Sequence, residues 1–279
     1  MRANKIEQII REHYAGVNPS MPTCDGFVCG DPDTDVTGVV TTFTVTADVL
    51  REAERKNANM IITHEPTFFI ECQGAWTQTD AVFSELRRMV REGHFVIWRC
   101  HDMMHAAVPD DIYEGFTDAM DWRAYAQPAR EKSGNLDQFE EDFFDYYDIP
   151  QTTLSGLAAE VKQKLGLQAV RCAGDPLRPC TRVGVLVGGG SLGFGRMPEL
   201  PLRLLQKKSI DVLVCGEIME LLLGTYMADA AALGTPGGMI VLGHERSEEW
   251  GMRAMHSWLA KELSVPVTFV DAKEPFYYL

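Results

Sequence analysis

The most constraining feature of the sequence is a short apolar run that stops at two potential metal ligands. Residues 60–63 read Met-Ile-Ile-Thr, His64 and Glu65 follow, and Pro66 then ends the strand because proline lacks a backbone N–H. Adjacent residues of a strand point to opposite faces, so His64 and Glu65 can meet at one point only if the chain curls there. Open α/β sheets bind ligands at the carboxyl ends of their strands, which is where this pair is predicted to lie.

Two further apolar segments end in residues of the same kind. A predicted strand over 95–98 is followed by His101 and, four residues later, by His105. A later strand ends just before His244, and Glu248 follows one helical turn beyond it if a helix begins nearby. Parallel strands deliver their carboxyl ends to one edge of a sheet, so the three segments are predicted to converge.

The order of predicted elements indicates an α/β protein. Residues 36–63 read strand, helix, strand, which is a βαβ unit with an expected right-handed connection. Later strands are predicted over 182–187, 211–214, 239–242 and 265–270, with helices between them. The second half therefore repeats the architecture of the first, and we predict an α/β protein with mixed or parallel sheets and a metal site at strand carboxyl ends.

The predicted boundaries are 1–115 for an N-terminal lobe, 116–150 for an acidic and aromatic connecting segment, and 151–279 for a C-terminal lobe. Within the connecting segment, residues 137–148 combine acidic and aromatic side chains. This combination is consistent with a helix that packs on a neighbour or with a lid, and no chemistry is assigned to it.

Composition narrows the class of partner. The 279 residues carry a formal net charge of −14. We therefore expect no basic patch that binds the phosphates of a nucleic acid, and nucleic acid is not an expected partner. No apolar run approaches the ~18 residues of a membrane span. The seven cysteines are odd in number and include no C-x-x-C pair, which argues against a disulfide framework. We therefore expect a soluble cytoplasmic protein without a membrane segment, while a local positive or metal-bearing pocket stays compatible with the charge.

The residue types at the three strand ends suit a transition metal. Imidazole together with carboxylate favours zinc, iron or manganese over calcium or magnesium. A shared carboxylate can bridge two divalent cations, and such a cation lowers the pKa of water to about 7, which makes hydrolysis the natural outcome. Taken singly, a histidine at a strand end is commonly a hydrogen-bonded structural residue, and a His–Glu pair one turn apart is commonly a solvated helix contact. Because such residues follow three strands in matching positions, a metal site is as strong an interpretation of them as a purely structural role.

Two other features lie near these segments. The glycine-rich stretch 188–193 lacks the Gly-Lys-Ser/Thr ending of a P-loop and the G-x-G-x-x-G spacing, so it is more consistent with a loop that lets the backbone approach closely at the mouth of a site. Glu217 follows the strand over 211–214 and could orient a ligand imidazole. Its other interpretation is an acidic residue that favours a helix N-terminus.

Five segments together resemble the Nif-three-like dinuclear metal-centre family, whose members are often labelled type 2 GTP cyclohydrolase I. They are IITHEP, CHDMMH, RVGVLVGGGS, DVLVCGEIME and GHERSEEWGMRAM. The resemblance covers nearly the whole chain outside residues 110–150, and the closing GH-x-x-S-E segment is its most specific part. It implies that His64 and His244 bind one metal and that Glu248 bridges two. It also implies two related α/β lobes with the metal site between them, and a ring-like homo-oligomer, often a hexamer.

This chain departs from the family pattern at several positions. Glu65 stands where the family has a second adjacent histidine, and His105 stands where it has an aspartate. The two changes together are equivalent to an exchange of one imidazole and one carboxylate at the other metal, so we infer that both residues remain ligands. Thr44 stands where the family usually has an aspartate. His101 matches a family histidine at the site, either as a direct ligand or as a residue behind the ligands.

Two hypotheses of different classes follow. The first is a metal-dependent hydrolase of a small nucleotide-like or phosphorylated molecule, in which His101 or Glu217 moves protons. Its two divalent ions would be held by His64, Glu65, His105, His244 and Glu248. The second is a non-catalytic metal-binding regulatory or scaffold protein, which predicts tight metal occupancy without a substrate-shaped pocket beside the ions. The GTP cyclohydrolase label comes from the resemblance alone and does not define the reaction.

Overall fold

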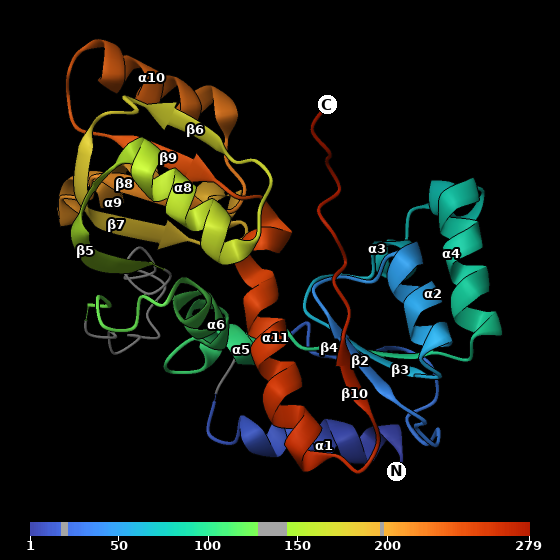
Figure 1. Cartoon of the computed structure of the whole chain (residues 1–279). Helices are drawn as coiled ribbons and strands as arrows, with labels where there is room; N and C mark the ends of the chain where they lie inside the picture. The colour runs from blue at the N-terminus through green and yellow to red at the C-terminus, as the bar shows by residue number, and fades with distance from the viewer. Residues whose placement is uncertain (18–21, 128–143, 196–197) are drawn as a thin grey trace. The chain divides into compact units, whose positions relative to one another are not determined.

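The computed structural model describes residues 1–17, 22–127, 144–195 and 198–279. The chain divides into two compact units, which Figure 1 colours along the sequence: Met1–Ile112 with Gly251–Lys273, and Tyr113–Trp250 with Glu274–Leu279. Within the described residues each unit contains one five-stranded sheet with both parallel and antiparallel neighbours. The α/β prediction with mixed sheets is therefore confirmed, whereas the finer boundaries at 115 and 150 stay a prediction.

The first sheet has the strand order β1-β4-β3-β2-β10. Its strands are β1 (Gly26–Cys29), β2 (Val39–Thr42), β3 (Met60–Thr63), β4 (Val96–Arg99) and β10 (Val267–Phe269). β1 is antiparallel to β4, and the other neighbours are parallel. The predicted βαβ unit is present as β2, α2 (Ala47–Arg55) and β3, with Val39 opposite Met60. After β2, the Thr46 side chain accepts a hydrogen bond from the backbone N–H of Val49 and caps α2.

The last strand of the chain lies in the first sheet, not in the sheet of the second half where the sequence placed it. β10 runs parallel to β2, with Val267 opposite Val39. The long helix α11 (His244–Glu262) carries the chain back to the first unit, because its residues up to Trp250 belong to the second unit and those from Gly251 to the first. The order of elements along a chain does not show which sheet edge a terminal strand joins, and this is why the prediction was wrong here.

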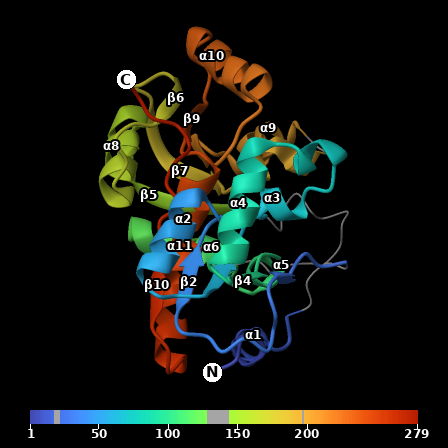
Figure 2. The ribbon, with the colours of Figure 1, turned by 90° about the vertical axis from the view of Figure 1, so that its right-hand side faces the viewer.

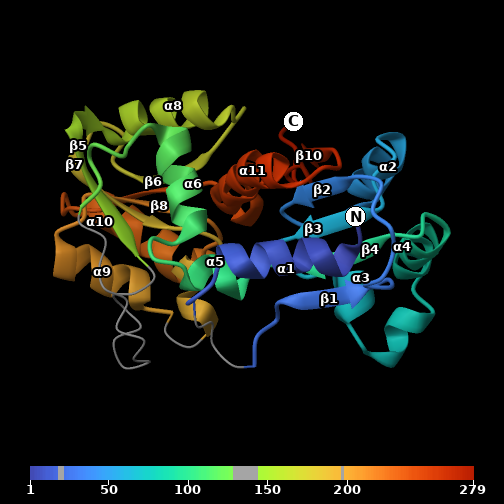
Figure 3. The same cartoon turned by 90° about the horizontal axis from the view of Figure 1, so that it is seen from below.

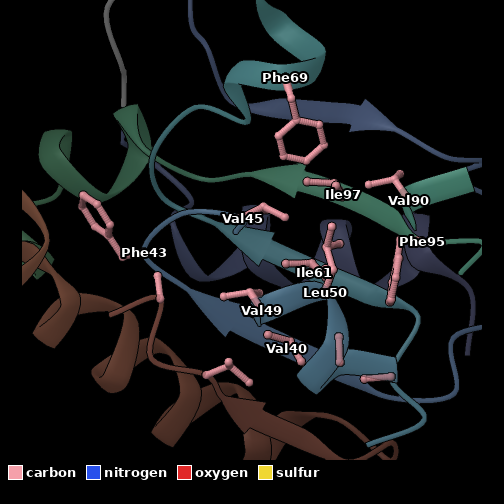
Figure 4. Packing of buried hydrophobic residues seen from close by; sticks show 14 residues of the cluster. Val40, Phe43, Val45, Val49, Leu50, Ile61, Phe69, Val90, Phe95 and Ile97 are labelled. Carbon is pink, nitrogen blue, oxygen red and sulfur yellow. The ribbon is translucent and has the colours of Figure 1, made fainter. Parts of the chain in front are cut away.

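Helices cover both faces of the first sheet. On one face, α2 and α4 (Ala81–Glu92) lie side by side over the strands, as Figure 2 shows. Val40, Ile61 and Ile97 point from β2, β3 and β4 into a core that includes Val49 and Leu50 of α2 (Figure 4). These strand residues have the apolar, β-branched character typical of a sheet that is buried on both faces.

The other face is covered by α1 (Ala3–His13) and the later part of α11, which Figure 3 shows on the opposite side of the strands from α2 and α4. The rings of His13 and Trp258 stack with centroids 4.0 Å apart. The Arg11 guanidinium lies 5.8 Å over the ring of Trp98 on β4. His13 therefore has a packing role.

The second sheet has the order β5-β7-β8-β9-β6, with β7, β8 and β9 parallel and an antiparallel strand at each edge. Its strands are β5 (Asp145–Thr153), β6 (Arg171–Gly174), β7 (Pro179–Leu186), β8 (Val212–Cys215) and β9 (Gly238–Val241). α9 (Leu200–Lys208) and α10 (Thr225–Ala232) share one apolar cluster with the sheet, through residues such as Leu204, Leu213 and Met227. Leu154 of α8 (Leu154–Leu165) packs near Gly238 of β9.

The acidic and aromatic segment differs in part from its prediction. Residues 137–143 lie outside the described part of the chain. Asp145–Thr153 form strand β5 rather than part of a helix. Tyr147 and Ile149 are buried two residues apart, which is the period of a strand, and the Tyr147 hydroxyl lies 2.6 Å from the Thr117 hydroxyl.

Further helical segments connect these elements. They are α3 (Phe68–Glu71), η1 (Ala75–Gln78), α5 (Asp102–Ala106), α6 (Asp111–Met120), η3 (Gly190–Gly195) and η4 (Glu220–Gly224). Among the described helices, none is both long enough and apolar enough to cross a membrane.

Candidate metal centre

The carboxyl ends of β3 and β4 bring three histidines together in the first unit. His64 follows β3, while His101 and His105 follow β4 at the start and near the end of α5. The ring centroids are 4.6 Å apart for His64 and His101, 5.1 Å for His64 and His105, and 4.7 Å for His101 and His105. One nitrogen of each ring lies within 4.8 Å of the others, so this three-histidine cluster has the spacing to hold a metal ion.

Each ring of the three-histidine cluster has its Nδ1 atom beside an oxygen acceptor. The pairs are His64 with the carbonyl oxygen of Cys100 (3.1 Å), His101 with Asp102 (2.8 Å) and His105 with Asp110 (3.1 Å). A carbonyl oxygen can only accept, so Nδ1 of His64 carries the proton and Nε2 keeps the lone pair that a metal would bind. Ionised carboxylates select the same tautomer for the other two rings. This arrangement is typical of histidines that bind metals.

Burial lowers the pKa of His101, and the neighbouring His64 lowers it further, while the hydrogen bond to Asp102 acts in the opposite direction. His101 is therefore neutral at pH 7 and keeps a lone pair. Burial by itself raises the pKa of Asp102, but hydrogen bonds from His101, the Cys24 backbone and Thr23 outweigh it and hold that pKa well below its ordinary value. Asp102 is thus an ionised acceptor for the imidazole across the neutral pH range.

A loop distant in sequence holds α5 in place. The buried carboxylate of Asp25 accepts hydrogen bonds from the backbone N–H groups of His101 (2.5 Å), Asp102 (2.9 Å) and Met103 (2.8 Å). Asp25 therefore satisfies the unpaired donors at the start of this helix and fixes its direction. The sequence places Asp25 in a turn-rich stretch, and no local pattern links it to a helix so much later in the chain.

Asp110 is a second functional residue that sequence patterns did not reveal. It is buried, and while one oxygen faces His105, the other accepts a hydrogen bond from the backbone N–H of Ile112 at 2.9 Å. From sequence alone it resembles the cap of the following helix, α6. A histidine followed five residues later by an aspartate is the only signal that could have suggested the pair.

Glu65 lies beside the three-histidine cluster and forms an ion pair as well. Its Oε1 atom is 3.7 Å from Nε2 of His101, and its Oε2 atom is 3.4 Å from the Arg99 guanidinium. Arg99 is only 9% exposed; it also donates to the carbonyl oxygen of His64 at 3.1 Å and pairs with Glu71 at 3.4 Å. Arg99 therefore holds one carboxylate oxygen of Glu65 and leaves the other on the side of His101.

The second unit contains a histidine–glutamate pair at the end of β9. Nε2 of His244 lies 3.2 Å from Oε2 of Glu248, which confirms that the two residues face each other across one helical turn. The helix begins at His244 itself, slightly earlier than predicted. Nδ1 of His244 lies 3.5 Å from Oε1 of Glu217, so Glu217 is placed to orient this imidazole. Glu248 is 3% exposed.

Gly188, just beyond β7, makes room for this pair. Its φ angle is +51°, and a Cβ atom there would lie 1.9 Å from Oε1 of Glu248 and 2.8 Å from Nε2 of His244. Its backbone N–H donates to the Ser247 hydroxyl at 2.9 Å. Gly216 approaches the same backbone so closely that a Cβ atom on it would meet the Gly188 carbonyl oxygen at 2.4 Å. These contacts support the interpretation of this glycine stretch as a close-approach loop.

Each predicted site residue thus lies at the carboxyl end of a parallel strand or in the turn that follows. The first unit groups His64, Glu65, His101 and His105, and the second groups Glu217, His244 and Glu248. The joining of the two groups into one centre stays a prediction. At Thr44, where the family usually has an aspartate, the hydroxyl donates to the carbonyl oxygen of Pro66 at 3.2 Å and so has a structural contact.

Replacing Asp110 with asparagine is expected to weaken metal binding. The amide keeps the shape of the side chain but removes the negative charge that accepts the N–H of His105. Losing a residue that hydrogen-bonds to a metal ligand typically lowers the metal affinity about 10- to 100-fold. Competition with a colorimetric chelator would measure the change. Asp118→Asn, an exposed change on α6, is the matched control and should leave the affinity as it is. Equal affinities for Asp110→Asn and the parent chain would contradict the role given to Asp110.

Fold and donor groups together define an α/β protein with histidine-rich, metal-capable clusters at the ends of its parallel strands. The chain belongs to the Duf34/NIF3 (NGG1p interacting factor 3) family, whose model matches residues 1–275. The family indicated by the sequence resemblance is therefore confirmed.

Individual relatives are distant. A protein of Clostridium acetobutylicum named GTP cyclohydrolase 1 type 2 homolog is 22% identical over 231 residues, which cover 80% of this chain and 81% of that protein. A protein of Clostridium perfringens with the same name is 22% identical over 289 residues and covers 100% of both. The crystal structure of a hypothetical protein from Staphylococcus aureus matches with a TM-score of 0.73 at 18% identity, over 100% of this chain and 99% of that one. The structural likeness shows that the fold is shared.

Proposed function

We propose that this chain is a metal-dependent hydrolase with a dinuclear metal centre, acting on a small nucleotide-like or phosphorylated molecule. The observation that carries the proposal is the three-histidine cluster, in which every Nδ1 atom faces an oxygen acceptor and one nitrogen of each ring lies within 4.8 Å of the others. The proposed ligands are His64, Glu65, His105, His244 and Glu248.

The donor groups fit a divalent transition metal. Neutral imidazoles with carboxylates suit zinc, iron or manganese. When bound, such cations supply Lewis acidity and lower the pKa of water to about 7.

In this proposal the residues next to the ligands hold or move protons. His101 has one nitrogen on Asp102 and the other 3.7 Å from Glu65, so it can hold or pass a proton at Nε2. Glu217 can orient His244 and accept a proton at Oε1, because the two atoms lie 3.5 Å apart. In this proposal Glu248 is the carboxylate shared by two cations, a role that rests on the family resemblance and on its contact with His244.

We further propose a cytoplasmic homo-oligomer, with a hexamer as the assembly that the family resemblance implies. The net charge of −14 supports the absence of nucleic acid as a partner, and the free cysteines support a reducing compartment. Sedimentation velocity on the full chain would test the assembly, since a monomer at micromolar concentration would contradict it.

A turnover screen tests the proposed function. The full chain, purified with its metal content measured, is offered a panel of nucleotides that includes GTP, together with cyclic phosphates. We expect metal-dependent hydrolysis of at least one member, abolished by His244→Ala and retained by His256→Ala, a histidine later on α11 outside the site. Bound metal without turnover across the panel would instead favour the non-catalytic metal-binding regulatory or scaffold protein.

A further inference from the structure

The first unit has a cavity that contains none of the proposed metal ligands. It has a volume of about 500 Å³ and lies among α3, η1 and α4. Pockets for small molecules commonly have volumes of about 300–1,000 Å³, so this one has the capacity for a ligand of that class. Its lining includes two arginines and no aspartate or glutamate.

The two arginines are not neutralised by the residues around them. Arg87 and Arg91 lie one turn apart on α4 and both line the cavity. Arg88, on the same helix, shows the contrast, because it forms ion pairs with Glu85 and Glu92. No carboxylate in the described part of the chain forms an ion pair with Arg87 or Arg91, and the one hydrogen bond that Arg87 makes there goes to a backbone carbonyl oxygen, 2.7 Å away.

This pair of positive charges contrasts with the net charge of −14 of the whole chain. The guanidinium group presents a planar fork of N–H donors that matches the oxygens of a phosphate. Gln73, Gln78 and Ser84 add amide and hydroxyl donors to the same walls. We propose that this cavity binds the phosphate group of a small molecule through Arg87 and Arg91. The proposal stands independently of the hydrolase function proposed above.

The surroundings allow two sources of this phosphate group, a free phosphate and a nucleotide. Trp76, in the same turn as the lining residue Thr77, is 62% exposed, and its ring centroid lies 5.3 Å from that of Phe83. An exposed indole beside a phosphate site is a surface on which a nucleobase can stack. The Arg87 guanidinium lies 5.8 Å over the same Phe83 ring, so the aromatic surface and the charged wall are continuous.

The cavity also shares α3 with the residues behind the metal cluster. Ile70 and Cys72 line the cavity, and Glu71 between them pairs with Arg99, which in turn pairs with Glu65.

Isothermal titration calorimetry on the full chain, first depleted of metal by a chelator, tests the proposal. The probes are inorganic phosphate and a nucleoside monophosphate. We expect binding that Arg91→Gln weakens by roughly tenfold to 100-fold, because charge-assisted hydrogen bonds are worth about 1.5–3 kcal/mol and each 1.4 kcal/mol is a factor of ten. Arg88→Gln, which removes an arginine already paired, is the matched control and should change the affinity less than twofold.

Arg87→Gln is expected to have a similar effect, and it also removes the hydrogen bond to Thr77. Arg91 makes no such bond within the described part of the chain, so Arg91→Gln tests the proposal even if η1 rearranges in the other variant. Trp76→Leu separates the two sources. If Trp76→Leu weakens the binding of the nucleotide alone, the cavity is a nucleotide site. If this variant and the parent chain bind both probes equally well, the cavity is a phosphate site. No binding at millimolar probe, unchanged binding in Arg91→Gln, or binding that requires added metal would each overturn the proposal.

Discussion

Replacing His105 with alanine is expected to lower the affinity for divalent metal by about 100-fold or more. The change removes one of three imidazoles whose rings lie within 5.1 Å of each other. Losing a residue that hydrogen-bonds to a metal ligand already lowers the metal affinity about 10- to 100-fold. Losing the ligand itself is expected to lower the affinity by at least the upper end of that range. The family resemblance implies an aspartate at this position, so the variant tests whether the imidazole of His105 serves as a ligand.

Titration of zinc or manganese against a competing chelator measures this affinity. The His105 side chain is 16% exposed, so its removal leaves a smaller defect in packing than the removal of the fully buried His64 would. His256→Ala, on α11, is the matched control and is expected to bind metal as the parent chain does. Thermal unfolding of the metal-free proteins checks that both variants are folded. An unchanged affinity in a folded His105→Ala protein would remove His105 from the site.

Gly188→Ala is expected to disrupt the histidine–glutamate pair and to destabilise the fold. The new Cβ atom would lie 1.9 Å from Oε1 of Glu248 and 2.8 Å from Nε2 of His244, at a backbone φ of +51° that alanine adopts at a cost. Strain of this kind costs about 1–3 kcal/mol before the clash is counted. Glu248 is buried, so it has little room to move away. We therefore expect both lower stability and less bound metal.

Gly189→Ala is the control for this prediction. A Cβ atom at that position would have no neighbour within 4 Å, and its φ is not in the left-handed region. Removing a glycine at a compatible position commonly stabilises a protein by about 0.4–1 kcal/mol, so the control should be neutral or slightly more stable. Urea unfolding of the metal-free chains and metal content of the folded chains are the two measurements. Equal behaviour of the two variants would show that Gly188 is not needed to make room for the pair.

Elements whose boundaries depend on local chemistry could be predicted from the sequence. β3 occupies residues 60–63 as predicted, because an apolar run ends there and Pro66 prevents it from extending further. α8 begins after Thr153, which accepts a hydrogen bond from the backbone N–H of Gly156, and it ends at Gly166 with a φ of +69°. Capping and left-handed termination depend on residues within one turn, so a single sequence reveals them.

Contacts between distant segments could not be predicted in this way. β10 pairs with β2, although more than 200 residues separate Val39 from Val267. Asp25 holds the start of α5, and Asp110 faces His105, yet neither lies in a periodic pattern. The folded chain determines which sheet edge a terminal strand joins and which acceptor orients an imidazole. Local sequence patterns therefore do not predict either of them.

The structure also provides a physical reason for the exchange at Glu65 and His105. A carboxylate at position 65 needs a cation, and the buried Arg99 lies 3.4 Å away. An imidazole at position 105 needs an acceptor, and Asp110 lies 3.1 Å away. Each exchanged residue therefore has a partner of the charge it requires, which supports the inference from sequence that both still serve the site.

Counting the metal ions in the purified chain tests the central claim most directly. Mass spectrometry of the elements in protein prepared without added metal is expected to find about two divalent ions per chain, as for other two-metal sites, and fewer after Glu248→Ala. Fewer than about one ion per chain, unchanged by Glu248→Ala, would contradict a centre in which that carboxylate joins two cations.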